Sequence, residues 1–293
     1  MFERTSANRK GSIFVDFNPK FHTTRVLLKQ TALHATIINH ITKEMTLNNM
    51  LVKGIGGYGH FELAEGLLEP DYHLQYLENN EPLIACEVGF SQPSKEVEGK
   101  IRAILNKTPT KVGVLFDIKE SPKYKNPFIM GDNNQDGASK GLVQAAVNSF
   151  KSKYSKTDMK SALNLQNFQS PEGTLSAYGQ SWMGEFTGFV QVYVKDPTTQ
   201  RAVARTKRLL FYGKQETSNK QWKERLRRPI YTPTPDLNIM LSDFLPFENE
   251  TYRRNLKFNW DELRYNIGSS RRMVAEKRIL KAVQFLRNKG IDC

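Results

Sequence analysis

Two carboxylates are spaced along the chain in a way that can build a site for a divalent cation. Asp71 directly follows Pro70, and Glu87 comes after fifteen intervening residues, inside a short apolar run. A carboxylate at the start of one strand and another on its partner strand converge on one side of a hairpin, where their oxygens suit Mg²⁺. A held Mg²⁺ activates water and neutralises charge on a phosphodiester. The pair therefore indicates metal-assisted phosphodiester chemistry, with Mg²⁺ or Mn²⁺ as the cofactor.

Each of these acids also has a simpler interpretation. A Pro-Asp pair such as Pro70-Asp71 is common in ordinary turns. Glu87 is harder to explain in this way, because a lone acid inside an apolar strand is costly unless it has a partner. That partner is either a metal ion or an ion pair with Lys100.

The net charge of the 293-residue chain is +13, and it is unevenly distributed. Residues 61–100 contain nine acidic residues and two lysines, whereas residues 201–293 contain 21 basic and 10 acidic residues. Basic clusters attract phosphate backbones because binding releases counterions, although each cluster alone also fits an ordinary solvated face. Their repetition over the last third of this basic protein favours nucleic acid as the partner. The candidate nucleic-acid-binding residues are Arg205, Lys207, Arg208, Lys223, Arg225, Arg227, Arg228, Arg271 and Arg272.

Composition excludes several other classes of protein. The chain has 39% hydrophobic residues and no apolar run near the ~20 residues that span a bilayer. Its two cysteines, Cys86 and Cys293, form neither a disulfide framework nor a zinc-ligand spacing. The first ten residues lack the apolar core of a secretion signal. We therefore expect an intracellular protein of the nucleus or cytoplasm, neither secreted nor inserted in a membrane.

The segments around the acids read as an α/β core. Two short strands are predicted at 73–77 and 83–89, and a helix that starts at Ser94 is followed by a strand at 112–118. Period-two alternation in the second strand places three residues on one face, namely Ala85, Glu87 and Gly89. This β-β-α-β order is typical of a mixed sheet with helices packed on it.

The rest of the chain yields a coarser prediction. Helical spacing is found at 24–42, 141–153 and 271–289, a glycine-rich turn is predicted at 54–59, and a β-hairpin is predicted from 185–194 and 202–212. Residues 230–250 contain three prolines and are expected to be irregular.

The order Pro70-Asp71, spacer, Glu87 and helix resembles the PD-(D/E)XK nuclease superfamily, which has the restriction-endonuclease-like fold. More narrowly, the segments around Asp71 and Glu87 are similar to those of a group of uncharacterised, largely fungal, eukaryotic nuclease-like proteins. Trp182 and residues 238–246 look like later conserved segments of that group. The resemblance implies an α/β fold with a mixed central sheet flanked by helices, an added β-hairpin and a C-terminal helical extension. It divides the chain into a nuclease-like core with an N-terminal helical segment, residues 1–215, and a basic extension that packs on it, residues 216–293.

The resemblance also implies roles for individual residues. Asp71 and Glu87 would bind the metal ion. The lysine of the superfamily is expected two positions after the second acid, where this chain has Gly89. The family pattern allows that lysine to move to the following helix, where Lys95 and Lys100 are the candidates. Two further roles are left open: Gln92 is a candidate for orienting water or phosphate, and a third acid would be Glu44, Glu62, Glu65 or Glu69.

These observations lead to two functional hypotheses. The first is a Mg²⁺-dependent nuclease that hydrolyses phosphodiester bonds of DNA, with catalytic residues Asp71, Glu87, Gln92 and one of the two lysines. The second is a catalytically inactive module of the same fold that binds nucleic acid or another protein, which the missing lysine at Gly89 favours.

Overall fold

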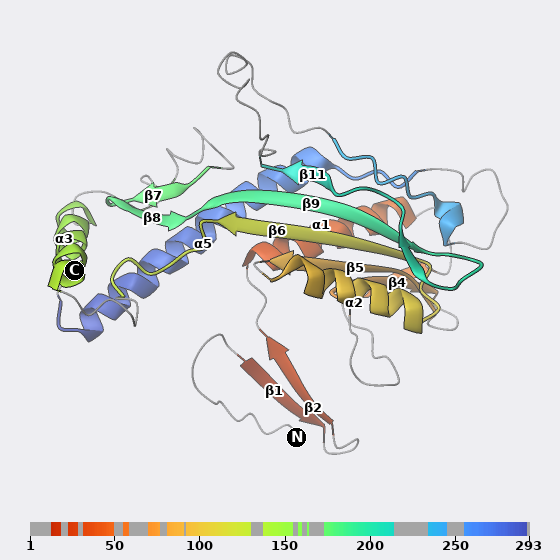
Figure 1. The fold of residues 1–293 in the computed structure, drawn as a ribbon, viewed down its shortest axis with the longest axis horizontal. Helices are drawn as coiled ribbons and strands as arrows, with labels where there is room; N and C mark the ends of the chain where they lie inside the picture. The colour runs from red at the N-terminus through yellow and green to blue at the C-terminus, as the bar shows by residue number, and fades with distance from the viewer. Residues whose placement is uncertain are drawn as a thin grey trace, which may run out of the picture.

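A computed structural model of the chain shows a mixed α/β fold around one central sheet (Figure 1). It describes residues 13–18, 23–28, 32–49, 55–58, 70–76, 81–90, 92–129, 137–154, 158–159, 163, 173–213, 234–244 and 255–291. No helix in these ranges is both long enough and apolar enough to cross a membrane.

The central sheet has the strand order β10-β9-β6-β5-β4-β3, and β11 also pairs with β9. Its strands are β3 (Ile55–Tyr58), β4 (Tyr72–Tyr76), β5 (Pro82–Phe90), β6 (Val112–Ser121), β9 (Glu185–Lys195), β10 (Ala202–Ala204) and β11 (Leu209–Tyr212). Strands β5 and β6 run parallel, and every other neighbouring pair is antiparallel. The sheet is therefore mixed, as the sequence predicts.

Strands β5 and β6 lie in the middle of the sheet, and both of their faces are covered. Helix α2 (Ser94–Lys107) connects them and lies against one face, which is why β5 is buried along almost its whole length instead of alternating between core and solvent. The buried residues of α2 are those with helical spacing, namely Val97, Ile101, Ile104 and Leu105. The predicted strand–strand–helix–strand order is confirmed here.

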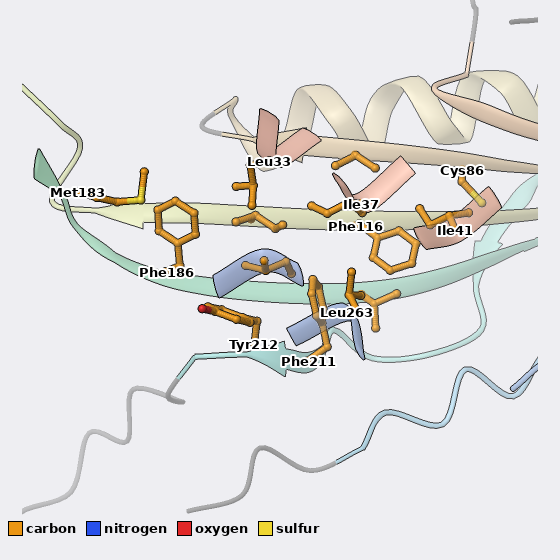
Figure 2. Close-up of a cluster of buried hydrophobic side chains, with 14 of the residues drawn as sticks. Leu33, Ile37, Ile41, Cys86, Phe116, Met183, Phe186, Phe211, Tyr212 and Leu263 are labelled. Atoms are coloured by element: carbon orange, nitrogen blue, oxygen red, sulfur yellow. The ribbon is translucent and has the colours of Figure 1, made fainter. Parts of the chain in front are cut away.

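Helices α1 (Ala32–Asn49) and α5 (Trp260–Asn288) cover the opposite face of the sheet (Figure 1). Figure 2 shows Leu33, Ile37 and Ile41 of α1 in one cluster with sheet residues such as Cys86 and Phe116 and with residues of α5. The irregular segment 234–244 contains one 3₁₀ turn, η2 (Leu241–Asp243). Residues of this segment belong to the same cluster. The described part of the predicted C-terminal extension thus packs on the central core.

Smaller elements complete the described structure. Strands β1 (Ile13–Asn18) and β2 (Thr23–Leu28) form a separate antiparallel pair. Helix α3 (Gly137–Tyr154) packs through Phe150 on Trp182, near the small hairpin of β7 (Leu175–Ala177) and β8 (Gln180–Met183).

Four predictions are corrected by the structure. Residues 23–28 form strand β2, so the helix predicted at 24–42 begins only at Ala32. Part of the predicted glycine turn is strand β3, because residues 55–58 pair with the open edge of β4. The predicted hairpin is not an addition to the sheet, since β9 pairs with β6 over ten residues. The C-terminal helix begins at Trp260, eleven residues before the predicted start.

A buried arginine connects α5 to the sheet. The Arg271 side chain is fully buried, and its guanidinium donates hydrogen bonds to the backbone oxygens of Gly173 and Gly184 and stacks on the ring of Phe186. Buried carbonyl groups need such donors, because an unpaired one carries a desolvation penalty. Arg271 is therefore a structural residue in this fold.

We expect Arg271→Ala to lower the free energy of unfolding by about 3–5 kcal/mol, since it leaves two buried carbonyls without this donor and opens a cavity. The matched control is Arg272→Ala, whose side chain is partly exposed and lies 3.7 Å from Glu276; it should cost less than about 1 kcal/mol. Urea denaturation followed by circular dichroism measures both. Equal losses for the two variants would contradict the structural role of Arg271.

Candidate metal-binding active site

The two predicted carboxylates lie side by side in the structure. Asp71 immediately precedes β4, and the register pairs Tyr72 with Cys86, so Asp71 lies opposite Glu87 on β5. Asp71 Oδ2 accepts a hydrogen bond of 2.8 Å from the backbone N–H of Val88. The side chain of Asp71 is also within hydrogen-bonding reach of Glu87. The hairpin of β4 and β5 thus brings the two acids together.

Glu87 is a buried acid with one basic partner beside it. Its residue surface is 2% exposed, and Lys100 of α2 donates a hydrogen bond of 2.9 Å to Oε2. Burial and, after it, the charge of Asp71 raise the pKa of Glu87 to about 8, although Lys100 acts in the opposite direction. At neutral pH, without a metal ion, Glu87 therefore tends to keep its proton.

Asp71 has the opposite electrostatic environment. Burial alone would raise its pKa, but the net direction is downward, because His34 donates a hydrogen bond to it and the Val88 N–H and the charge of Lys100 add to that effect. His34 Nε2 lies 3.1 Å from Asp71 Oδ2. One acid of the pair thus stays ionised, and the other is poised to exchange its proton for a cation.

The contact between His34 and Asp71 was not predicted from the sequence. His34 lies in the first turns of α1, a helix that packs on the opposite face of the sheet from α2. No spacing rule connects it to Asp71, because the contact joins segments 37 positions apart that meet only when α1 docks at the edge of the hairpin.

The position of Gly89 explains why the expected lysine is elsewhere. A Cβ atom on Gly89 would lie 2.9 Å from Cγ2 of Val97, a buried residue of α2. A side chain at this position would therefore push α2 away from the sheet. Lys100 lies three residues further along the same helix and reaches Glu87 from there.

A further acid, the buried Asp117 on β6, extends the site. It pairs in register with Gly89 and is 1% exposed. Ser94 donates a hydrogen bond of 2.7 Å to it, Lys119 Nζ lies 2.8 Å from Oδ1, and Arg208 forms an ion pair with Oδ2. The signal that identifies Glu87, an acid inside an apolar strand, is also present at Asp117 in the sequence.

The other predicted catalytic residues lie outside this group of contacts. The side chains of Gln92 and Lys95 are exposed, and the backbone oxygen of Gln92 accepts a hydrogen bond from Lys119. Glu44 lies on α1 near the first residues of α5, where it accepts a hydrogen bond from the backbone N–H of Asn259. The remaining candidates for a third acid, Glu62, Glu65 and Glu69, lie outside the described residues.

The predicted nucleic-acid-binding residues have three different environments. Arg208 is 42% exposed on its side chain and joins Asp117 beside the site, and Lys207 next to it is exposed. Arg205 instead forms a two-pronged ion pair with Asp243, and Arg272 lies next to Glu276. Four candidates lie outside the described residues, namely Lys223, Arg225, Arg227 and Arg228.

Arg271 must be removed from the predicted nucleic-acid-binding residues. Its side chain is fully buried among Gly173, Gly184 and Phe186. A phosphate could reach the guanidinium only if α5 separated from the sheet.

The acids at this site fit a divalent cation that takes oxygen ligands. Asp71 and Glu87 come from adjacent strands, and Glu87 Oε1 has no hydrogen-bond partner within the described structure, although Lys100 Nζ lies 2.8 Å away. Two neighbouring carboxylates repel one another when both are ionised, and a shared cation removes that repulsion. The arrangement can thus hold Mg²⁺ or Mn²⁺ next to an ammonium group.

The raised pKa of Glu87 predicts how stability changes with pH. Between its ordinary pKa of 4.5 and its folded value of about 8, the native state binds a proton that the unfolded state has released. The free energy of unfolding therefore falls as pH rises through this range, by up to about 1.4 kcal/mol per pH unit for this one group. Glu87→Gln has no titrating group, so its stability relative to wild type should increase from about pH 5 to about pH 8.

Urea denaturation in the presence of a chelator measures this difference, with Glu96→Gln as the control because Glu96 is an exposed acid on the first turn of α2. A constant difference between Glu87→Gln and wild type across the range would show that Glu87 is ionised throughout.

The close contact at Gly89 predicts the effect of a single added methyl group. Gly89→Ala should lower the free energy of unfolding by about 1–3 kcal/mol, because the branched side chain of Val97 cannot rotate away within a helix. Gly99→Ala is the matched control, since its Cβ would meet nothing within 4 Å on the exposed part of α2. That control should raise stability by up to about 1 kcal/mol. Thermal and urea melts compare the two, and a neutral Gly89→Ala would disprove the steric account.

Comparisons of this chain with family profiles, with curated proteins and with solved structures find no match. Its function is therefore inferred from the residues around Asp71 and Glu87.

Proposed function

We propose that this protein is a Mg²⁺-dependent nuclease that hydrolyses phosphodiester bonds of DNA, built on a restriction-endonuclease-like core. One observation carries the proposal: Lys100 of α2 holds its ammonium group on Glu87, next to Asp71. The PD-(D/E)XK pattern needs two acids and one lysine at a single point. In this chain Lys100, on the helix that follows Glu87, would be that lysine, because Gly89 occupies the usual lysine position.

The order of elements around the site supports the same proposal. Asp71 stands at the start of β4, Glu87 lies on the antiparallel partner β5, and Lys100 is on the helix that connects β5 to the parallel strand β6. Each residue of the proposed trio is thus held by a regular element of the core. Such positioning limits movement of the reacting groups, which catalysis requires.

Asp71 and Glu87 would hold the divalent ion. When bound, the ion supplies charge neutralisation on the phosphate and a water of lowered pKa. Glu87 must lose its proton to become a ligand, so its raised pKa makes ion binding dependent on pH. His34 keeps the Asp71 carboxylate ionised and oriented through its hydrogen bond.

Lys100 would act on the phosphate itself. Its side chain is 34% exposed, so the ammonium group contacts both Glu87 and the solvent side of the site. A fixed cation at this point stabilises the negative charge that develops on a phosphodiester during attack by water.

Basic residues beside the site provide a path for the DNA backbone. Arg208 and Lys119, paired with Asp117, have side chains that are 42% and 32% exposed. Because Asp117 is level with Gly89 on the neighbouring strand, this cluster lies about two residues, roughly 7 Å, beyond Glu87 along the sheet. A DNA strand has one phosphate per ~3.4 Å of helix axis, so that separation spans about two phosphates of one strand.

The second candidate function is binding of nucleic acid without cleavage. It is favoured by Gly89 at the usual lysine position and by the cations that already accompany the acids, Lys100 at Glu87 and Lys119 and Arg208 at Asp117. Such pairs compensate the buried charges without any metal ion.

Nicking of supercoiled plasmid DNA in Mg²⁺ or Mn²⁺ distinguishes the two functions. We expect the wild-type protein to nick the plasmid and Asp71→Asn and Glu87→Gln to be inactive, because each removes a ligand charge. Lys100→Met should lower the rate by about 10²–10³-fold, the usual effect of losing one group that stabilises transition-state charge. Lys95→Met is the matched control, as an exposed lysine on the same helix, and should stay close to wild type.

DNA binding measured at several salt concentrations completes the experiment. If the wild-type protein nicks no faster than Asp71→Asn, the nuclease proposal is wrong. Binding that weakens as salt rises, in the absence of cleavage, would instead establish the second function, because phosphate contacts release counterions.

A further inference from the structure

Helices α1 and α5 bring together three metal-ligating side chains away from the site described above. His40 and Glu44 lie one turn apart on α1, and Glu262 lies in the first turn of α5. One potential ligand atom from each of the three lies within 4.8 Å of the other two. The spacing of four residues places His40 and Glu44 on the same face of their helix.

His40 is the unexplained member of this cluster. Its side chain is 1% exposed, and neither ring nitrogen makes a hydrogen bond of normal geometry within the described structure. Glu44 Oε1, on the next turn, is 4.0 Å from Nε2, which is too far for a hydrogen bond. The backbone of Asn259 lies beside the ring but does not meet normal hydrogen-bond geometry. Buried polar groups almost always make a well-formed hydrogen bond, so an imidazole that lacks one is open to a partner that binds it.

Space for such a partner lies next to the imidazole. A cavity of about 310 Å³ between the two helices is lined by His40 and Glu262, together with polar side chains that include Thr36, Asn39 and Ser270. A bound ion at His40 could therefore keep water in a remaining coordination position.

We propose that His40, Glu44 and Glu262 form a binding site for a divalent transition-metal ion of the zinc class. An imidazole with two carboxylates suits Zn²⁺ better than Mg²⁺, because Mg²⁺ takes oxygen ligands and keeps its waters. Two ligand atoms that are each about 2.1 Å from one ion lie at most about 4.2 Å apart. A pair of atoms at the 4.8 Å limit must therefore approach by at least about 0.6 Å, which the partly exposed Glu262 allows.

Lys43 occupies part of this site in the metal-free protein. Its ammonium group forms an ion pair with Glu262 Oε1, and its side chain is 49% exposed. Lys43 can thus release Glu262 and turn into solvent when an ion binds. Lys43 would therefore compete with the metal ion for Glu262, so removing its charge should change the affinity for the ion.

Metal binding here would fasten α1 to the start of α5. The same helix α1 carries His34, which contacts Asp71 at the proposed nuclease site. The zinc site does not depend on nuclease activity, because it shares no ligand with Asp71 or Glu87. The tests below separate the two sites.

The experiment uses the full chain with Asp71→Asn and Glu87→Gln, so that no zinc is held at the nuclease site. Titration of Zn²⁺ against a chromophoric chelator should show one ion bound per chain. Glu262→Gln and His40→Gln should each weaken binding at least about tenfold, the lower range for loss of a group at a metal site. Lys43→Met should strengthen binding, because the competing cation is gone. Glu276→Gln, a partly exposed acid on the same helix, is the control and should leave binding unchanged.

The outcomes are separable from those at the nuclease site. Bound zinc in the double variant that is lost with Glu262→Gln supports the proposal whether or not the wild-type protein cleaves DNA. The proposal is overturned if the double variant binds no zinc, or if His40→Gln and Glu262→Gln both bind it as tightly as the control. Circular dichroism of each variant verifies that a loss of zinc is not a loss of fold. Displacement of the zinc by millimolar Mg²⁺ would likewise overturn it.

Discussion

The structure depends on how one carboxylate is kept inside the sheet. Glu87 lies on a central strand that is covered on both faces, so its charge cannot be solvated by water. An isolated charge in this position would cost many kcal/mol, so Glu87 tends to keep its proton at neutral pH, and Lys100 from the covering helix lies beside it to partner the charge when the proton leaves. The charge of Asp71, next to the neighbouring strand, opposes ionisation of Glu87 and so favours a proton or a cation there. The balance between these neighbours is what makes the site responsive to a divalent ion.

Helix α1 connects several parts of the molecule. One stripe of it, Leu33, Ile37 and Ile41, packs on the apolar face of the sheet. Its first turns present His34 to Asp71, and its later turns present His40 and Glu44 to the start of α5. Residues of this one helix thus contact the core, the paired acids and the cluster of His40, Glu44 and Glu262. A change in how α1 packs would move all three together.

Local patterns predicted the elements around the acids, because each is specified within a short window. The apolar run of β5 and the helical spacing of Val97, Ile101 and Ile104 do not depend on distant residues. Predictions failed where a distant partner decides the conformation. The apolar residues of 23–28 also fit a helix, but they form a strand because 13–18 pairs with them. Residues 55–58 form a strand despite two glycines, because β4 offers them an unpaired edge.

By itself, the sequence determined that Asp71 and Glu87 would meet, since a hairpin of short strands leaves little choice of register. It also offered Lys95 and Lys100 as substitutes for the lysine missing at Gly89, without choosing between them and without showing why position 89 excludes a lysine. That reason, the contact with Val97, exists only once α2 is packed on the sheet. Tertiary structure alone decided that Arg271 is buried and Arg208 is beside an acid, since both read equally as surface charges in the sequence. It also decided the contact of His34 with Asp71 and the approach of His40 to within 4.8 Å of Glu262, because both depend on how helices dock on the whole core.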